Sequence, residues 1–316
     1  MLGYAIRRLV AMVPLVIAIA TVTFFLMHSV QGGPFDRERP TSQRQREVLE
    51  ARYGLDEPLH VQYVTYIGNL LQFDLGVTLR GDSRDVREII EERMGKSLQL
   101  GIAAFIFATV GGLSLGIVSS LNQNGFGDYV GVFIATVGAA MPSIVLAPIL
   151  TIIFAVEFGW FRVLSNDYGF MPWFSGDFSN WRGVVLPTIA LGFLPLAFVA
   201  RITRASMLEV LRQDYIRTAR AKGLREFVVV LRHSAKNALI PVLTVLGPIF
   251  AGLITGSIVI EQAFAIPGIG REFVRSVLVR DYGLIMGVTV FYAVLIAFMN
   301  LVVDLLYGVA DPRIRY

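Results

Sequence analysis

The sequence predicts an all-α, polytopic membrane protein with six transmembrane helices. Its 316 residues are 55% hydrophobic and only 16% charged, whereas a soluble domain carries about 25% charged residues. The mean hydropathy of the chain is +0.63. A helix needs about 20 apolar residues to cross a hydrocarbon core, and six apolar runs of about that length follow one another along the chain. This composition excludes a soluble globular protein.

The apolar runs define the predicted spans, which are residues 9–30, 98–121, 130–158, 184–202, 238–260 and 283–307. The third run is long enough to tilt or break. It contains Pro142 and Pro148, and proline removes a backbone hydrogen bond and clashes with the preceding helical turn. We therefore expect a bent helix in this run.

The first run resembles a signal peptide at its start. Arg7 and Arg8 precede a short apolar stretch, and Ala18 and Ala20 have the spacing of a cleavage site. The apolar character nevertheless continues to Met27, which is long enough to span the membrane. The sequence therefore predicts an uncleaved transmembrane helix.

The distribution of lysine and arginine predicts that both termini lie in the cytoplasm. Cytoplasmic loops of membrane proteins are richer in these residues than outside loops. With the N-terminus inside, the inside segments hold thirteen of them, nine between Arg201 and Lys236, and the short outside loops hold five. The outside loop of residues 31–97 is too long for this rule to apply.

Two outside segments have features of their own. Residues 31–97 carry apolar side chains at roughly helical spacing and are expected to form a small cap of short helices. Residues 159–183 carry Trp160, Trp173 and Trp181, which suit the membrane–water interface. The apolar positions of the first segment are Leu49, Tyr53, Leu55, Tyr63, Tyr66, Ile67, Leu70 and Leu71.

Two short patterns imitate catalytic or binding motifs without the context that the chemistry needs. Residues 95–97 resemble the end of a phosphate-binding loop, but Ile90 stands where the first glycine belongs. Residues 112–116 fit the pattern around a nucleophilic serine, yet they lie in mid-span, far from any histidine. Close packing of two helices explains the small residues Gly112 and Gly116 better than a catalytic site does. An intramembrane serine hydrolase using Ser114 stays as an alternative.

The ionisable residues near the spans do not indicate an ion path. Glu157, Arg201 and Asp304 all lie near the ends of apolar runs, where charged side chains reach the interface. An ion-coupled secondary transporter keeps charges at mid-depth and is therefore the weaker alternative. The chain has three scattered histidines and no cysteine, so no metal site is predicted.

The inside loop of residues 203–237 contains a predicted short helix from Tyr215 to Lys222. Asp214 can cap its N-terminus, and Gly223 supplies the left-handed residue that ends it. About eight residues at 1.5 Å each make a rod of roughly 12 Å. A rod of this size is suited to docking on another protein.

The composition of this short helix leaves two interpretations open. Ala219 and Ala221 have little bulk, so another protein surface can receive the helix closely, with Arg217, Arg220 and Lys222 beside acidic groups. Alternatively, a basic amphipathic segment lies on anionic lipid headgroups. Spacing alone does not decide between them.

The same loop resembles a known family. Residues 214–223, followed by residues 231–233 and 237–241, resemble the coupling-loop motif of binding-protein-dependent ABC importer permeases. More narrowly, they resemble the first permease subunit of dipeptide, oligopeptide and nickel importers. Arg217, Thr218 and Ala219 stand where the general motif has an acidic residue and two alanines, and this departure is similar to the peptide branch. Further matches to that branch are Arg7-Arg8 and residues 53–59, 62–63, 256–270, 304–307 and 311–313.

The resemblance implies a six-span permease of the type I importer fold. Its parts would be a first span (1–30), an outside cap (31–97) and a permease core (98–316) with the coupling loop (203–237). It would form a heterodimer with a paralogous permease, and its short helix would sit in a groove of one of two cytoplasmic ATPase subunits. An extracytoplasmic binding protein would deliver the substrate. ATP and magnesium would be bound by the ATPase subunits, so this chain itself is expected to be no enzyme and to hold no cofactor. Its surroundings would include membrane lipid, and no nucleic-acid partner is expected.

The resemblance also assigns roles to residues. The coupling helix would comprise Asp214, Tyr215, Arg217, Thr218, Ala219, Arg220, Ala221, Lys222 and Gly223. Helix bending and packing are expected at Pro142, Pro148, Pro241, Gly247, Pro248, Gly252 and Gly256. The bacterial cytoplasmic (inner) membrane is the expected location. Short peptides are the expected substrate, and nickel chelates and oligosaccharides stay open because the binding protein selects the cargo.

Overall fold

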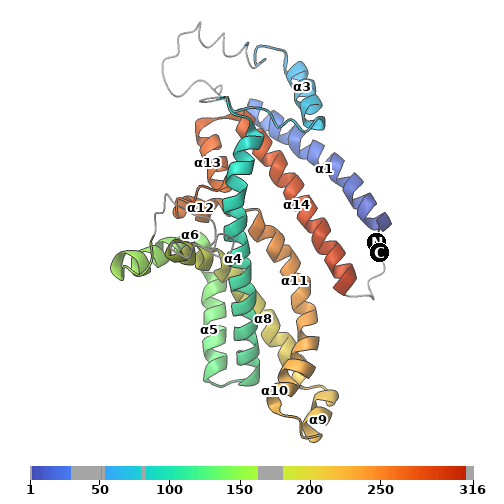
Figure 1. Ribbon diagram of the computed structural model, residues 1–316, viewed down its shortest axis with the longest axis vertical. Helices are drawn as coiled ribbons and strands as arrows, with labels where there is room; N and C mark the ends of the chain where they lie inside the picture. The colour runs from blue at the N-terminus through green and yellow to red at the C-terminus, as the bar shows by residue number, and fades with distance from the viewer. Residues whose placement is uncertain (1, 30–50, 52–53, 80–82, 163–180, 311–316) are drawn as a thin grey trace. The chain divides into compact units, whose positions relative to one another are not determined.

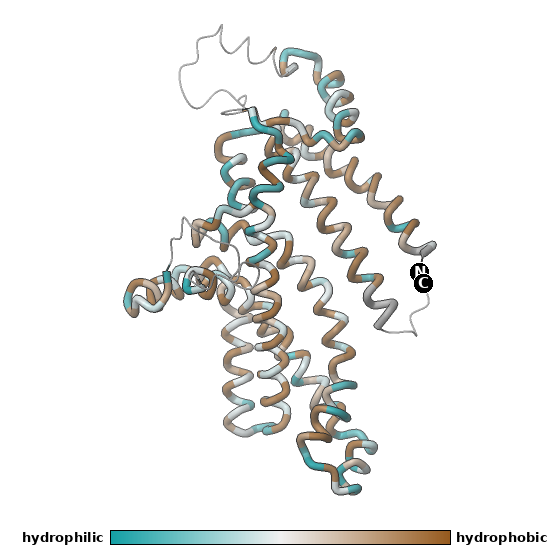
Figure 2. The backbone as a smooth tube through the Cα atoms, in the orientation of Figure 1, coloured by the Kyte–Doolittle hydropathy of each residue, from teal (hydrophilic) through white to brown (hydrophobic). Residues whose placement is uncertain are grey.

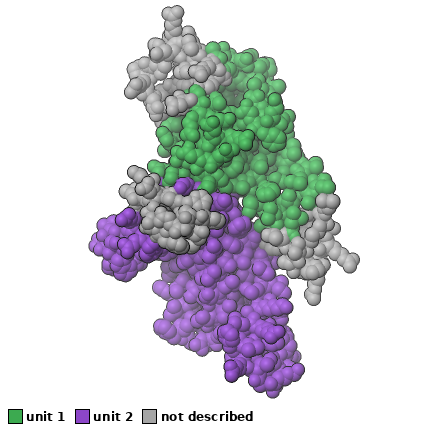
Figure 3. All heavy atoms as spheres, viewed as in Figure 1, with its two compact units in different colours: residues 1–95, 267–316 green, residues 96–266 purple. Residues whose placement is uncertain are grey.

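The computed structural model describes residues 2–29, 51, 54–79, 83–162 and 181–310. These residues are almost entirely helical, and the strand-like pairing among them is an isolated antiparallel bridge between Val77 and Asp85. They form two compact units, residues 1–95 with 267–316 and residues 96–266, shown in green and purple in Figure 3. The helices are labelled in Figure 1.

The predicted spans are present as helices. Five described helices are long and apolar enough to cross a membrane: residues 5–29, 86–121, 181–211, 226–254 and 282–305. A sixth candidate consists of two helices bent by 111°. Figure 2 shows the hydrophobic residues along these helices and more hydrophilic residues around α9. The all-helical, multi-span fold predicted from composition is confirmed.

In the second unit, α8 (Trp181–Leu211) is the central helix. α5 (Phe126–Ala140), α6 (Ser143–Leu150), α11 (Lys236–Ile254) and α12 (Ile258–Ala263) all pack against it. Small residues let these helices approach closely. A Cβ atom at Gly116 of α4 (Val86–Leu121) would lie 2.5 Å from Cβ of Thr203, and one at Gly138 would lie 2.9 Å from Cβ of Ala197. Both distances leave no space for a side chain.

The bend in the third predicted span lies at Pro142. α5 ends at Ala140, and Pro142 is the N-cap of α6, where its fixed φ of −60° suits a helix start. Pro148 lies inside α6 and does not interrupt it. A π-helical segment, η1 (Thr151–Glu157), continues α6. The predicted bend is therefore confirmed, and it comes from the first of the two prolines.

In the first unit, α1 (Leu2–Ser29) packs along α14 (Tyr282–Ala310), and α3 (Leu59–Leu71) packs on α1. Phe24 stacks on Tyr66 at a centroid distance of 5.7 Å, and Thr21 Oγ1 lies 2.8 Å from Tyr63 Oη. α13 (Ile269–Val279) packs on α14. Asp281 precedes α14 and accepts hydrogen bonds from the backbone N–H groups of Leu79 and Leu284.

Several predicted boundaries are wrong. α4 begins at Val86, so the last part of the predicted outside loop is helical and continues into the second span. The fifth run does not stay helical to residue 260, because α11 ends at Ile254 and Gly256 has φ +83°. Within the outside loop, α3 confirms one short helix. Residues 31–50, Tyr53 and Trp173, named in the predictions, lie outside the described residues.

Candidate functional site

The short helix predicted in the inside loop is α9 (Asp214–Ala221). Its N-cap is Gln213, in an extended conformation and without a side-chain capping hydrogen bond. Asp214 is the first helical residue, with its carboxylate 3.5 Å from Nη1 of Arg217. The prediction that Asp214 caps the helix is wrong, although a negative charge in the first turn still complements the helix dipole.

α9 ends as predicted, with a left-handed glycine after its last turn. Gly223 has φ +75°, a left-handed conformation that costs glycine nothing. Its N–H donates to the carbonyl of Arg220 at 2.9 Å, and the N–H of Lys222 donates to the carbonyl of Thr218 at 3.0 Å. The chain therefore turns sharply after two helical turns, which gives α9 a fixed length.

One face of α9 is buried in its own chain. Ile216 and Ala219 pack with Val229 and Val210, and Ala219 is only 7% exposed. Of the two alanines predicted to face a partner, Ala219 therefore faces inward, and Ala221 is exposed. The sequence did not reveal this, because a small residue suits a tight contact on either face.

The outward face of α9 carries Tyr215, Arg217, Thr218, Ala221 and Lys222. Asn237 donates a hydrogen bond from Nδ2 to the hydroxyl of Tyr215 at 2.8 Å, which ties this face to the start of α11. Among the residues that the structure describes, the acidic partner of Arg217 is Asp214. These residues give the outward face two cations and one aromatic ring.

The third predicted cation, Arg220, is paired within the chain. Its Nε and Nη2 donate to the two carboxylate oxygens of Glu226, at 3.1 and 2.6 Å. Glu226 begins α10 (Glu226–Val228), so the pair closes the turn after α9. Glu226 therefore holds the charge of Arg220 within the chain, whereas Arg217, 3.5 Å from Asp214, keeps a side chain that is 74% exposed.

The seat of α9, which is the apolar contact of Ile216 and Ala219 with Val229 and Val210, connects it to two long helices. Val229 belongs to η2 (Val229–Ala235), a π-helical segment that leads directly into α11, and Val210 belongs to the last turn of α8. Nearby, Met207 of α8 packs with Val230 and Ala238. Apolar packing therefore joins α9 to the end of α8 and, through η2, to the start of α11.

A buried polar cluster that sequence reasoning missed lies between α5 and α8. Nε and Nη2 of Arg204 donate to the two oxygens of Asp128, at 2.6 and 2.7 Å. Ser119 of α4 also donates to this carboxylate, and the N–H of Asn124 does so at 2.9 Å. Asp128 is 3% exposed. Its signal in the sequence was a lone acidic residue, Asp128, in the predicted 122–129 loop, together with Arg204, two residues after the fourth apolar run.

The remaining predicted positions lie where helices are joined or packed. α11 runs through Pro241, Gly247, Pro248 and Gly252 without interruption, and Gly256 lies in the link to α12. Bending at these positions during transport stays a prediction. Ser114 lies inside a continuous α4 and not on the sharp strand-to-helix turn that exposes a nucleophilic serine, which argues against the hydrolase alternative.

Comparison with known proteins gives consistent matches along the chain. Residues 112–316 match the family described as "Binding-protein-dependent transport system inner membrane component", and residues 1–78 match its N-terminal companion. The chain is 44% identical, over 318 residues, to the dipeptide transport system permease protein DppB of Bacillus subtilis, covering 100% of this chain and 98% of that one. It is 39% identical, over 321 residues, to the oligopeptide transport system permease protein OppB of Haemophilus influenzae, covering 100% of both.

A solved structure supports the fold. A chain in the crystal structure of an amino acid ABC transporter with histidines has a TM-score of 0.51 to this chain at 17% identity, covering 70% of this chain and 94% of that one. Together with the span-length helices, these matches indicate a multi-pass protein of the bacterial inner membrane. The chain belongs to the family of binding-protein-dependent transport system inner membrane components.

Proposed function

We propose that this chain is the first permease subunit of an ATP-driven importer of short peptides. The proposal rests on one observation above all: identity of 39–44% over the whole chain to permeases of dipeptide and oligopeptide transport. Nickel chelates and oligosaccharides are less favoured, because the permeases that the chain resembles over its whole length belong to dipeptide and oligopeptide transport. The chain contributes the path and the coupling, and the energy comes from partner subunits.

The partners follow from the same proposal. A paralogous permease completes the translocation path as a heterodimer, two cytoplasmic ATPase subunits bind ATP and magnesium, and an extracytoplasmic protein delivers the peptide. In this arrangement α9 sits in a groove of one ATPase subunit. Its outward cations, Arg217 and Lys222, meet acidic groups of that groove, while Ile216 and Ala219 hold it on the permease.

The seat of α9 explains how closure of the ATPases would reach the membrane. α9 ends at a fixed turn at Gly223 and packs on the last turn of α8 and on η2. A packed contact of this kind moves as a unit, since protein interiors are close-packed and resist local compression. Motion of the ATPase groove therefore displaces η2, on which α9 packs, and η2 in turn packs on both α8 and α11.

Charge reversal on the outward face tests the docking proposal. The variant Arg217→Glu/Lys222→Glu is reconstituted in liposomes with the partner permease, the ATPase subunits and the binding protein, and uptake of a labelled dipeptide is measured. We expect uptake to fall at least tenfold and the ATPase subunits to dissociate during purification, with normal insertion of the chain. The matched control is Arg212→Glu, a reversal of an exposed arginine outside α9.

Two results would contradict the proposal. Normal uptake by the inserted double variant would exclude docking through the outward face of α9. Binding of α9 to anionic vesicles, with no change in ATPase retention in the double variant, would instead favour the membrane-surface interpretation. The substrate is tested separately, by competition of labelled dipeptide uptake with unlabelled peptides, nickel chelates and oligosaccharides. Competition by a nickel chelate or an oligosaccharide alone would reassign the cargo.

A further inference from the structure

In the first unit, both ring nitrogens of His28 face oxygen atoms. His28 lies in the last turn of α1. Its Nδ1 is 2.8 Å from the backbone carbonyl oxygen of Phe24, and its Nε2 is 3.1 Å from Oε1 of Gln62 in α3. His28 and Gln62 are both half-buried. A backbone carbonyl only accepts hydrogen bonds, so Nδ1 of His28 carries a proton.

The orientation of the Gln62 amide decides what Nε2 of His28 carries. The amide nitrogen of Gln62 donates to the backbone carbonyls of Leu55 and Glu57, at 3.2 and 2.8 Å. Turning the amide over would set its oxygen against these two carbonyl oxygens, with no proton between them. Oε1 of Gln62 therefore stays directed at His28, where it only accepts. Because a neutral imidazole has a single N–H group, the imidazolium is the form of His28 that satisfies both contacts.

The surroundings of His28 suit a cation. The ring of Phe24 lies against it, with a centroid distance of 4.2 Å and an angle of 31° between the ring planes. A cation within about 6 Å of an aromatic centroid is attracted to the ring. The carboxyl end of a helix also carries a partial negative charge, and this is the end of α1 at which His28 lies. Both effects favour the protonated ring.

We infer that protonated His28 is a pH-dependent latch that fastens α3, and the turn before it, to α1. The His28 latch consists of the ring, the Gln62 amide and the three backbone carbonyls that these two groups contact. Histidine ordinarily changes its charge between pH 5 and 8. The fastened form holds one proton more than a form with a bare Nε2, so the latch is fastened at low pH and loosens as the pH rises.

The other titratable groups around His28 do not replace it in this role. On the elements packed around it, these groups are His60, Tyr63 and Tyr66 of α3, Asp56 and Glu57 of the preceding turn, Asp281 and Tyr282. Among the described residues, none of them forms a hydrogen bond or an ion pair with the His28 side chain. Tyrosine titrates near pH 10 and carboxylates near pH 4, and burial raises the pKa of Tyr66 to about 12. These values lie outside the range of histidine.

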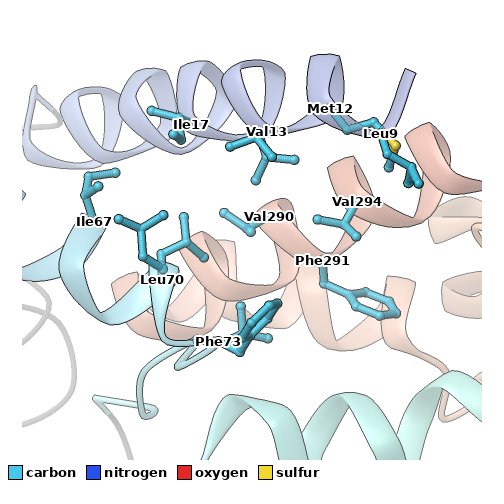
Figure 4. A pocket seen from close by; sticks show the side chains of 13 residues that line it. Leu9, Met12, Val13, Ile17, Ile67, Leu70, Phe73, Val290, Phe291 and Val294 are labelled. Carbon is cyan, nitrogen blue, oxygen red and sulfur yellow. The ribbon is translucent and has the colours of Figure 1, made fainter. Parts of the chain in front are cut away.

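The His28 latch lies at one end of the contact between α1 and α3. Next to it, Thr21 Oγ1 lies 2.8 Å from Tyr63 Oη, a contact that does not depend on the His28 proton. Further along, Ile17 of α1 and Ile67 and Leu70 of α3 line an apolar groove of about 460 Å³ (Figure 4). The two helices are therefore less closely packed there. Loosening of the latch should free the start of α3 and the turn that precedes it.

Nitrogen NMR of the full chain in bilayer discs tests the protonation state. The chain has three histidines, so labelling with ¹⁵N-histidine gives three sets of ring signals, which the variants His60→Asn and His233→Asn assign. For His28 we expect two N–H groups at about pH 5 and one at about pH 8.5. A neutral His28 ring at the lower pH, or a ring with two N–H groups at both, would overturn the inference.

Hydrogen exchange tests whether the proton fastens α3. After correction for the intrinsic pH dependence of exchange, the amides of residues 54–64 should exchange about fivefold faster at pH 8.5 than at pH 5, as expected for one lost hydrogen bond. His28→Phe keeps an aromatic ring but has no N–H donor, so we expect fast exchange at both pH values.

The matched control is His60→Asn, which removes an exposed histidine of α3 and should keep the pH response of the unchanged chain. A pH response that survives in His28→Phe would overturn the inference, because another group would then carry it. Slow exchange of His28→Phe at both pH values would overturn it as well, because α3 would then be held without the latch.

Discussion

Two arginine–carboxylate pairs in the second unit have nearly the same geometry and opposite surroundings. In both, Nε and Nη2 of the arginine donate to the two carboxylate oxygens. The Arg204–Asp128 pair lies between α5 and α8, with the Asp128 side chain 5% exposed and the Arg204 side chain 28% exposed. The Arg220–Glu226 pair lies after α9, with side chains 44% and 57% exposed.

The difference in burial separates two roles. A carboxylate removed from water depends on its partner, since breaking a buried pair leaves an uncompensated charge. An exposed pair exchanges its partner for water and contributes little. We therefore interpret Arg204–Asp128 as a fixed joint of the helical bundle, and Arg220–Glu226 as an adjustable contact that orients the turn after α9. The following variants test this division.

The largest effect is expected from breaking the buried pair. Asp128→Asn leaves the Arg204 guanidinium without its anion and should reduce the free energy of unfolding by about 3 kcal/mol. The measurement is denaturation of the purified chain in mixed micelles. Replacing both residues, in Asp128→Leu/Arg204→Met, should restore most of the loss, because two apolar side chains of similar size remove the charge altogether. An equal loss in the single and double variants would show that the charge is not the cause.

Packing next to the buried pair should have the second largest effect. In Gly116→Val the new Cβ would lie 2.5 Å from Cβ of Thr203 and 2.7 Å from the carbonyl oxygen of Ala200. Overpacking of this kind costs about 2 kcal/mol, measured by the same denaturation. Gly127→Ala is the control, since its Cβ would meet Val118 at an ordinary 3.5 Å. If Gly116→Val is as stable as the control, close helix approach does not support the joint.

The seat of α9 is expected to respond less than the bundle. Ala219→Glu places a carboxylate against Val229 and Val210, where it has no partner, and should cost about 1–2 kcal/mol as the helix lifts from its seat. Limited proteolysis after Arg217 or Lys222 should accelerate in the same variant. Ala221→Glu, on the exposed side of the same helix, should leave both measurements unchanged. Equal proteolysis of the two variants would place Ala219 on the outward face after all.

The sequence predicted those features that depend on local chemistry. The five span-length helices and the bent sixth candidate follow from apolar length, the bend at Pro142 follows from a missing N–H group, and the end of α9 follows from glycine at a left-handed position. The inward direction of Ala219 depends on Val229 and Val210, which come from other elements. The pairing of Asp128 with Arg204 joins residues 76 positions apart, and no local rule selects it from the other arginines of the loop.

The smallest effect on stability is expected at the exposed pair. Arg220→Gln removes the bidentate contact to Glu226, but water replaces it, so the free energy of unfolding should change by less than about 1 kcal/mol. The Debye screening length falls to about 3 Å in 1 M salt. The difference in the free energy of unfolding between Arg220→Gln and the unchanged chain should therefore vanish there. The buried Asp128→Asn variant should keep its deficit at the same salt concentration. If Arg220→Gln still has a lower free energy of unfolding than the unchanged chain in 1 M salt, this pair is also part of the rigid bundle. The two pairs would then differ in their position and not in their role.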